Sequence, residues 1–193
     1  MYPAEGEFLA AARELADAQG ALLVYDEVQC GLGRTGSFFA WESAGVRPHA
    51  VTMAKGLANG LPIGCLLVAD DAPRGFEPGD HASTFGGNLV ACAAANAVVD
   101  AIDEALLANV RERSAQLRAG LEALPGVVEV RGGGLLLAAE LERPAAEVVA
   151  GAFERGLLVL TAGERVLRLT PPLNVSAEEC EQALATLREA CAN

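Results

Sequence analysis

The sequence predicts an α/β fold for the first half of the chain and a smaller α+β unit for the rest. In the first half, helix-length segments alternate with short, continuous apolar runs, which are typical of a parallel-rich sheet covered on both faces. These runs end in polar residues or glycines, and the carboxyl ends of parallel strands meet at one edge of a sheet. In the second half, short strands stand in pairs between helices, which favours a separate mixed unit.

Composition and charge exclude several classes of protein. The formal net charge of −12 opposes binding to nucleic acid or to an anionic membrane, so we expect neither as a partner. The apolar runs are too short to span a membrane, and no secretion leader opens the chain, so we expect a cytoplasmic protein. The five cysteines form no CxxC pair, which predicts neither a disulfide framework nor a metal site.

The elements of the first half follow from apolar spacing. A helix is predicted over residues 7–19, because apolar side chains recur at helical spacing and Gly20 is a good terminator. The run 21–25 predicts a fully buried strand. A helix-like stretch around residues 38–44 then leads to another strand over 50–53.

A long helical pattern follows Asn88, which is a plausible N-cap, and stops at Pro125-Gly126. Because this pattern is long for one globular helix, we expect a break near residues 107–112. We place a domain boundary there, which gives domains over residues 1–108 and 109–193.

The second domain has its own order of elements. Ser176 and Glu179 form a capping-box pattern that predicts the start of its last helix. Pro144 in the first turn and Gly156 at the end delimit another helix over 144–155. Strands are predicted over 127–131 and 135–141, on either side of a glycine trio, and over 157–160 and 166–170.

Three polar clusters fall at the ends of predicted strands: Asp26–Gln29, Lys55 with its neighbouring glycines, and Ser83–Asn88. Asp26 and Lys55, and likewise Lys55 and Thr84, are 29 positions apart. One helix and one strand have about this length, so neighbouring strands could bring all three clusters to one rim.

Together these clusters have the chemistry that pyridoxal phosphate (PLP) requires. A partly desolvated lysine is a nucleophile toward carbonyls. A carboxylate can keep a pyridine nitrogen protonated, and hydroxyls before a helix N-terminus suit a phosphate. Each signal is weak by itself, because Asp26 could cap a turn, Lys55 could be a surface residue, and Ser83-Thr84 could be an ordinary helix entry.

The order of these motifs resembles one family, the class III aminotransferases, and within it the acetylornithine aminotransferase branch. The resemblance rests on segments 22–36 (LLVYDEVQCGLGRTG), 52–57 (TMAKGL), 83–88 (STFGGN) and 167–173 (LRLTPPL). It implies the fold type I architecture of PLP transferases, with part of the large PLP-binding domain followed by the small C-terminal domain. The family's chain extends well upstream of residue 1, so we expect a truncated or split large domain.

The resemblance also implies roles for residues. Lys55 matches the catalytic lysine that holds the cofactor as a Schiff base, and Asp26 matches the acid that pairs with the pyridine nitrogen. Other cofactor-binding positions are Glu27, Val28, Gln29 near the ring oxygen, and Thr84, the phosphate ligand that such enzymes donate across a homodimer interface. Ser83 and Arg168 match substrate contacts, and the guanidinium of Arg168 would clamp a carboxylate.

The activity implied is PLP-dependent transfer of an amino group from N-acetylornithine to 2-oxoglutarate in arginine biosynthesis. Two alternatives stay open. One is a non-catalytic fragment, or a half-enzyme that needs an upstream partner polypeptide. The other is a different class III ω-aminotransferase, of the ornithine or 4-aminobutyrate type.

Overall fold

The computed structural model describes residues 2–72 and 76–192, and the chain forms two compact units. The N-terminal unit comprises Ala4–Gly33 and Ser37–Asp103. The C-terminal unit comprises Glu104–Asn193 with the short segments Met1–Pro3 and Arg34–Gly36. Among the residues described, no helix is long and apolar enough to cross a membrane.

In its described residues, 4–33, 37–72 and 76–103, the N-terminal unit contains one sheet, two α-helices and two short 3-10 helices. Gly20 ends the first helix in a left-handed conformation, as predicted, and its N–H donates to the carbonyls of Ala16 and Asp17. The stretch predicted as helix-like around residue 40 is a single 3-10 turn. In chain order the elements are α1 (Gly6–Gln19), β1 (Val24–Asp26), η1 (Ala40–Ser43), β2 (Ala50–Met53), η2 (Lys55–Ala58), β3 (Cys65–Val68) and α2 (Leu89–Ala101).

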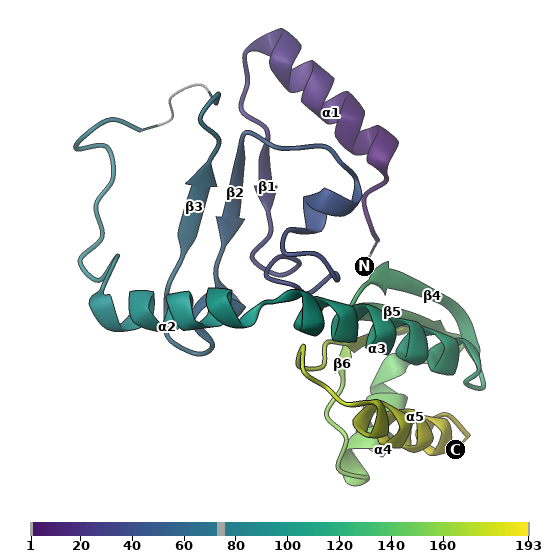
Figure 1. Cartoon of the computed structure of the whole chain (residues 1–193). Coiled ribbons are helices and arrows are strands. Elements are labelled where there is room, and N and C mark those ends of the chain that lie inside the picture. The colour runs from purple at the N-terminus through teal and green to yellow at the C-terminus, as the bar shows by residue number, and fades with distance from the viewer. Residues whose placement is uncertain (1, 73–75, 193) are drawn as a thin grey trace. The chain divides into compact units, whose positions relative to one another are not determined.

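The sheet of this unit has the order β1-β2-β3, and the three strands lie side by side in Figure 1. β1 pairs with β2 in parallel, whereas β2 pairs with β3 antiparallel. The sheet is therefore mixed, and the expectation of parallel neighbours is wrong for β3. The connection between β2 and β3 contains only η2, and a parallel crossover needs a dozen or more residues.

The strands of this sheet are unequally buried. β2 supplies Val51 and Met53 to a small core together with Leu57 of η2. β1 and β3 are exposed, with Val24 at 45% and Leu67 at 48% relative exposure. The prediction of a fully buried strand over residues 21–25 is therefore wrong, because nothing in the part of the chain described covers β1 as β2 is covered.

The long helical pattern is broken earlier than predicted. α2 ends at Ala101, the backbone leaves helical geometry at Ile102 (φ −86°, ψ 73°), and α3 begins at Glu104. The break expected near residues 107–112 is therefore wrong. Apolar spacing continues through Ile102 and Leu106 without a glycine or proline, so the pattern carries no sign of the interruption. The two compact units also divide at this point rather than after residue 108.

The C-terminal unit is a four-stranded antiparallel sheet of order β4-β5-β7-β6 with three helices. α3 packs on β4 and β5, α4 packs on β6 and β7, and α5 packs on both helices. The glycine trio lies largely within β4 rather than between strands, and Pro144 is the N-cap of its helix rather than a first-turn residue. The elements are α3 (Glu104–Glu122), β4 (Val127–Gly133), β5 (Leu136–Leu141), α4 (Ala145–Glu154), β6 (Leu160–Thr161), β7 (Val166–Leu169) and α5 (Ala177–Ala192).

One continuous core fills this unit, and Leu117, Leu137, Leu167 and Leu187 are all at most 2% exposed. The predicted capping box at the start of α5 is confirmed. The N–H of Ser176 donates to the Glu179 carboxylate (2.8 Å), and the N–H of Glu179 donates to Ser176 Oγ (3.1 Å).

The segment Arg34–Gly36 is built into the same unit. The Arg34 guanidinium donates to the carbonyls of Leu135 (3.2 Å) and Pro171 (2.5 Å). Gly134 lies so close to this segment that a Cβ there would be 2.3 Å from the Arg34 carbonyl oxygen. Burial lowers the pKa of Arg34, and the two carbonyls accept hydrogen bonds from its guanidinium.

Candidate active site

Asp26 stands at the end of β1, directly opposite Thr52 of β2. Its carboxylate oxygen Oδ1 accepts hydrogen bonds from the N–H of Val28 (3.0 Å) and from the hydroxyl of Thr52 (3.2 Å). Both of these bonds reach one oxygen, which leaves Oδ2 facing another direction with acceptor capacity to spare. Sequence reasoning missed Thr52, because aligning the ends of the runs 21–25 and 50–53 places Ala54 opposite Asp26, and only the observed register pairs Asp26 with Thr52.

Lys55 follows β2 and opens η2 with a left-handed backbone (φ 48°). This conformation costs a non-glycine residue about 1–2 kcal/mol. Such strain concentrates at functional positions, where the surrounding structure imposes it. Because β1 and β2 run in parallel, Asp26 and Lys55 lie at the same end of adjacent strands, as predicted.

Glu27, the residue after Asp26, is only 3% exposed. Its carboxylate accepts hydrogen bonds from the N–H groups of Ala40 (2.8 Å) and Trp41 (2.9 Å). A Cβ at position 31 would lie 2.9 Å from Glu27 Oε2, so glycine there lets the chain pass close to the carboxylate. Burial raises the pKa of Glu27, and the two N–H donors oppose that rise. Its side chain therefore anchors the loop that returns to η1.

The two residues that follow have different surroundings. Val28 is half-buried and uses its backbone N–H to hold Asp26, as described above. Gln29 is exposed, so its amide is available to a ligand at this end of the sheet. Their predicted contacts with a cofactor ring stay predictions.

Ser83 and Thr84 lie in an exposed turn before α2. Gly86 packs against Ser83, where a Cβ would be 2.8 Å from the Ser83 Cβ. Asn88 caps α2 as predicted, accepting from the N–H of Ala91 (2.9 Å). α2 contacts η2, the element that Lys55 opens, and in Figure 1 the chain beyond β3 returns to the end of the sheet where β2 finishes. No hydrogen bond joins the Ser83-Thr84 turn to Asp26 or Lys55 among the described residues.

Arg168 belongs to the C-terminal unit, in the middle of β7. Leu167 and Leu169 are buried on one face and Arg168 is on the other, which confirms the predicted alternation. Arg168 lines a cavity of about 440 Å³ whose other walls are mainly apolar. Its Nε is buried without a hydrogen-bond partner in the part of the chain that the structure describes. A buried, unsatisfied guanidinium nitrogen suits an anionic ligand.

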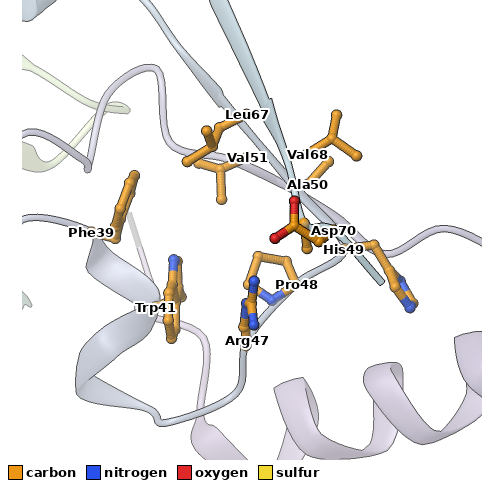
Figure 2. Close-up of a pocket in the computed structure, with 11 residues that line it drawn as sticks. Phe39, Trp41, Arg47, Pro48, His49, Ala50, Val51, Leu67, Val68 and Asp70 are labelled. Carbon is orange, nitrogen blue, oxygen red and sulfur yellow. The ribbon is translucent and has the colours of Figure 1, made fainter. Parts of the chain in front are cut away.

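A second cavity, of about 270 Å³, lies in the N-terminal unit at the start of β2. Figure 2 shows the rings of Phe39 and Trp41, which stack with centroids 6.1 Å apart, on one side of this cavity. It is at the end of β2 remote from Lys55. His49, on its wall, accepts from the N–H of Leu23 (2.9 Å) and lies 3.2 Å from Asp17. His49 therefore connects α1 and Leu23 to the start of β2.

Comparison with known proteins decides the family. The family described as Aminotransferase class-III matches residues 1–191. This chain belongs to the class III aminotransferases. Acetylornithine aminotransferase 1 of Bordetella parapertussis is 49% identical over 190 residues, covering 96% of this chain and 48% of the relative. Acetylornithine aminotransferase of Gloeobacter violaceus is 50% identical, with 97% and 48% covered.

Solved structures give the same fold. N-acetylornithine aminotransferase from Stenotrophomonas maltophilia superposes with a TM-score of 0.86 at 39% identity, covering 98% of this chain and 52% of that one. Ornithine aminotransferase from Toxoplasma gondii superposes with a TM-score of 0.89 at 34% identity, covering 98% and 47%, and its structure contains PLP at partial occupancy. This class III chain therefore spans about half the length of the relatives that it matches.

Class III aminotransferases are PLP-dependent transferases. The residues of this member fit that cofactor on two grounds. Asp26 keeps one carboxylate oxygen available beside the end of β2, and Lys55 brings an exposed amine to the same end of the sheet. The resemblance inferred from the sequence is thereby confirmed at the level of family, fold class and cofactor.

Proposed function

We propose that this chain carries the PLP site of a transaminase that moves an amino group from N-acetylornithine, or a related ω-amine, to 2-oxoglutarate. The carrying observation is the parallel pairing of β1 with β2, which sets Asp26 and Lys55 at one end of adjacent strands. Relatives about half identical to the chain and named acetylornithine aminotransferases support the amino donor. The reaction would then serve arginine biosynthesis in the cytoplasm.

Each site residue has a chemical task in this proposal. When bound, PLP supplies an electron-accepting ring that stabilises negative charge at the substrate carbon that bears the reacting amine. Lys55 would bind the aldehyde carbon through its amine and carry the proton that leaves and returns at that substrate carbon. Asp26 would keep the ring nitrogen protonated, with Val28 and Gln29 beside the ring.

Three further residues have proposed roles in binding anionic groups or substrate. Thr84, in the turn before α2, would bind the phosphate of the cofactor held by the neighbouring subunit of a homodimer. Ser83 would contact substrate. Arg168 would bind a substrate carboxylate bidentately, which its unsatisfied Nε favours. Glu27, whose carboxylate holds the backbone of Ala40 and Trp41, would support this site through the loop rather than through its own charge.

The cofactor assignment can be tested on a single side chain, because Lys55 is the only lysine in the sequence. The chain would be produced alone and with any polypeptide encoded directly upstream, incubated with PLP and reduced with borohydride. We expect a phosphopyridoxyl mass on the Lys55 peptide. Lys55→Arg, which keeps the charge, is the matched control and should give none. Unmodified wild-type Lys55 under both conditions would refute the proposal.

The choice of amino donor needs a separate measurement. In single turnover with the PLP-loaded protein, the absorbance of the cofactor should change faster with N-acetylornithine than with ornithine or 4-aminobutyrate. A faster reaction with ornithine would move the assignment to the ornithine type, to which the Toxoplasma gondii structure also belongs.

A half-enzyme that works only with another polypeptide is the second candidate. It is favoured by the exposed apolar residues of β1 and β3 and by the half-length match to relatives. It predicts no transamination by the purified chain alone and turnover once the complementing polypeptide is present. Turnover by the chain alone would exclude this candidate.

A further inference from the structure

The carboxylate of Asp26 stands at an exposed strand end, where side-chain rotation would otherwise be little restricted. Two hydrogen-bond donors, both directed at Oδ1, restrict the rotation of this side chain. The N–H of Val28 is a backbone group and is present whatever the side chain. The hydroxyl of Thr52 comes from the neighbouring strand and is the donor that the choice of amino acid decides.

The sheet fixes the position of Thr52. Its Cα pairs directly with that of Asp26 in the parallel register of β1 and β2. The flanking residues Val51 and Met53 are 4% and 7% exposed and point to the core face, so Thr52 points to the opposite face. A β-branched side chain on a strand has few rotamers, which keeps the hydroxyl 3.2 Å from Asp26 Oδ1.

We infer that Thr52 is a positioning residue for Asp26: by occupying Oδ1, it turns Oδ2 toward the ring nitrogen of the bound cofactor. This inference rests on the proposed PLP site. A hydrogen bond to a charged carboxylate is stronger than one between neutral groups, and its loss permits the carboxylate to rotate away. Thr52 does not touch the cofactor in this role and acts through Asp26.

The test compares three variants of the same protein that gave the Lys55 adduct. Thr52→Val removes the hydroxyl and keeps the shape, Thr52→Ser keeps the hydroxyl, and Thr161→Val makes the same exchange at an exposed strand position of the C-terminal unit. The dissociation constant of PLP is measured by absorbance titration, with Lys55 adduct yield after borohydride as a second readout. Thr52→Val should weaken PLP binding about tenfold or more. Thr52→Ser and Thr161→Val should stay within about twofold of wild type.

A cofactor analogue separates positioning from a general structural effect. Deaza-pyridoxal phosphate has carbon in place of the ring nitrogen, so it cannot use Asp26 as a partner. The tenfold difference between wild type and Thr52→Val should disappear with this analogue, and their thermal midpoints should agree. An equal loss with both cofactors, or no loss with PLP, overturns the role of Thr52 while the Lys55 adduct stands. Absence of that adduct in wild type overturns both proposals.

Discussion

The two compact units bury their apolar residues to very different extents. In the C-terminal unit, helices α3, α4 and α5 cover a sheet whose Leu137 and Leu167 are fully buried. In the N-terminal unit, β2 is buried but its neighbours expose Val24 and Leu67 by almost half. The C-terminal unit thus contains the partners that its apolar side chains need. The candidate site lies in the unit that lacks them, which agrees with a chain half the length of its relatives.

Truncation of one leucine in each sheet should give the largest difference between the units. Leu137→Ala should lower the unfolding free energy of the chain by about 2–5 kcal/mol, because it leaves a cavity in a closed core. Leu66→Ala, at a position 43% exposed, should cost less than about 1 kcal/mol. Urea unfolding followed by circular dichroism measures both. Equal costs would show that β3 is covered in solution.

Two glycines with similar φ angles allow the cost of backbone strain to be distinguished from the cost of steric overlap. Gly132 (φ 119°) would place a Cβ 2.1 Å from the Leu136 carbonyl oxygen, whereas a Cβ at Gly60 (φ 115°) meets nothing within 4 Å. Gly132→Ala should therefore cost about 3 kcal/mol, from overlap added to strain. Gly60→Ala should cost about 1 kcal/mol from strain alone. Thermal melts at matched concentration test this, and similar losses would contradict the packing described for β4.

Glu27 makes the unfolding free energy of the N-terminal unit depend on pH. Burial raises its pKa, so between its ordinary and raised values the folded chain holds a proton that the unfolded chain has lost. Its contribution to the unfolding free energy is therefore full in acid and declines as the pH rises through that window. In acid, Glu27→Gln should cost about 1–3 kcal/mol, because Ala40 or Trp41 loses its acceptor.

The difference in unfolding free energy between wild type and Glu27→Gln should become smaller as the pH rises, because only wild type loses the proton of the Glu27 carboxyl. Urea titrations across acidic to neutral pH, with exposed Glu7→Gln as the control, measure it. A gap that widens with pH would mean that the N–H donors outweigh burial and that the pKa is lowered.

The smallest expected effect is a gain in stability at the candidate site. The three described non-glycine residues with positive φ, Leu32, Lys55 and Asn59, all belong to the N-terminal unit. Lys55→Gly should raise the unfolding free energy by about 0.5–1 kcal/mol, because glycine adopts this conformation without strain. Lys55→Ala loses the same amine but keeps a Cβ, so it should give no gain. An equal gain from both would assign the effect to charge rather than to the backbone.

Local signals predicted local features well. Gly20, Asn88 and the Ser176–Glu179 pair end or begin helices as expected, because their chemistry acts within one turn. The residues with proposed chemistry also followed from strand ends, since Asp26 and Lys55 do lie at one end of a parallel pair.

Features set by tertiary surroundings were not predictable. The direction of β3 depends on the short connection through η2, and the break at Ile102 has no local marker. The exposure of Val24 depends on what packs against β1, which the run 21–25 does not encode. The role of Thr52 could not be predicted, because its hydroxyl bonds to a residue of another strand and only the register of the two strands identifies that residue.

The exposed strand β3 has a consequence for how the chain behaves in solution. Leu66, Leu67 and Val68 follow one another at the edge of the sheet, where unpaired backbone groups can accept another strand. The net charge of −12 keeps copies apart at low ionic strength. Dissolved salt shortens the range of that repulsion to about 10 Å at 0.1 M. Light scattering should therefore increase with salt concentration and stay low in dilute buffer.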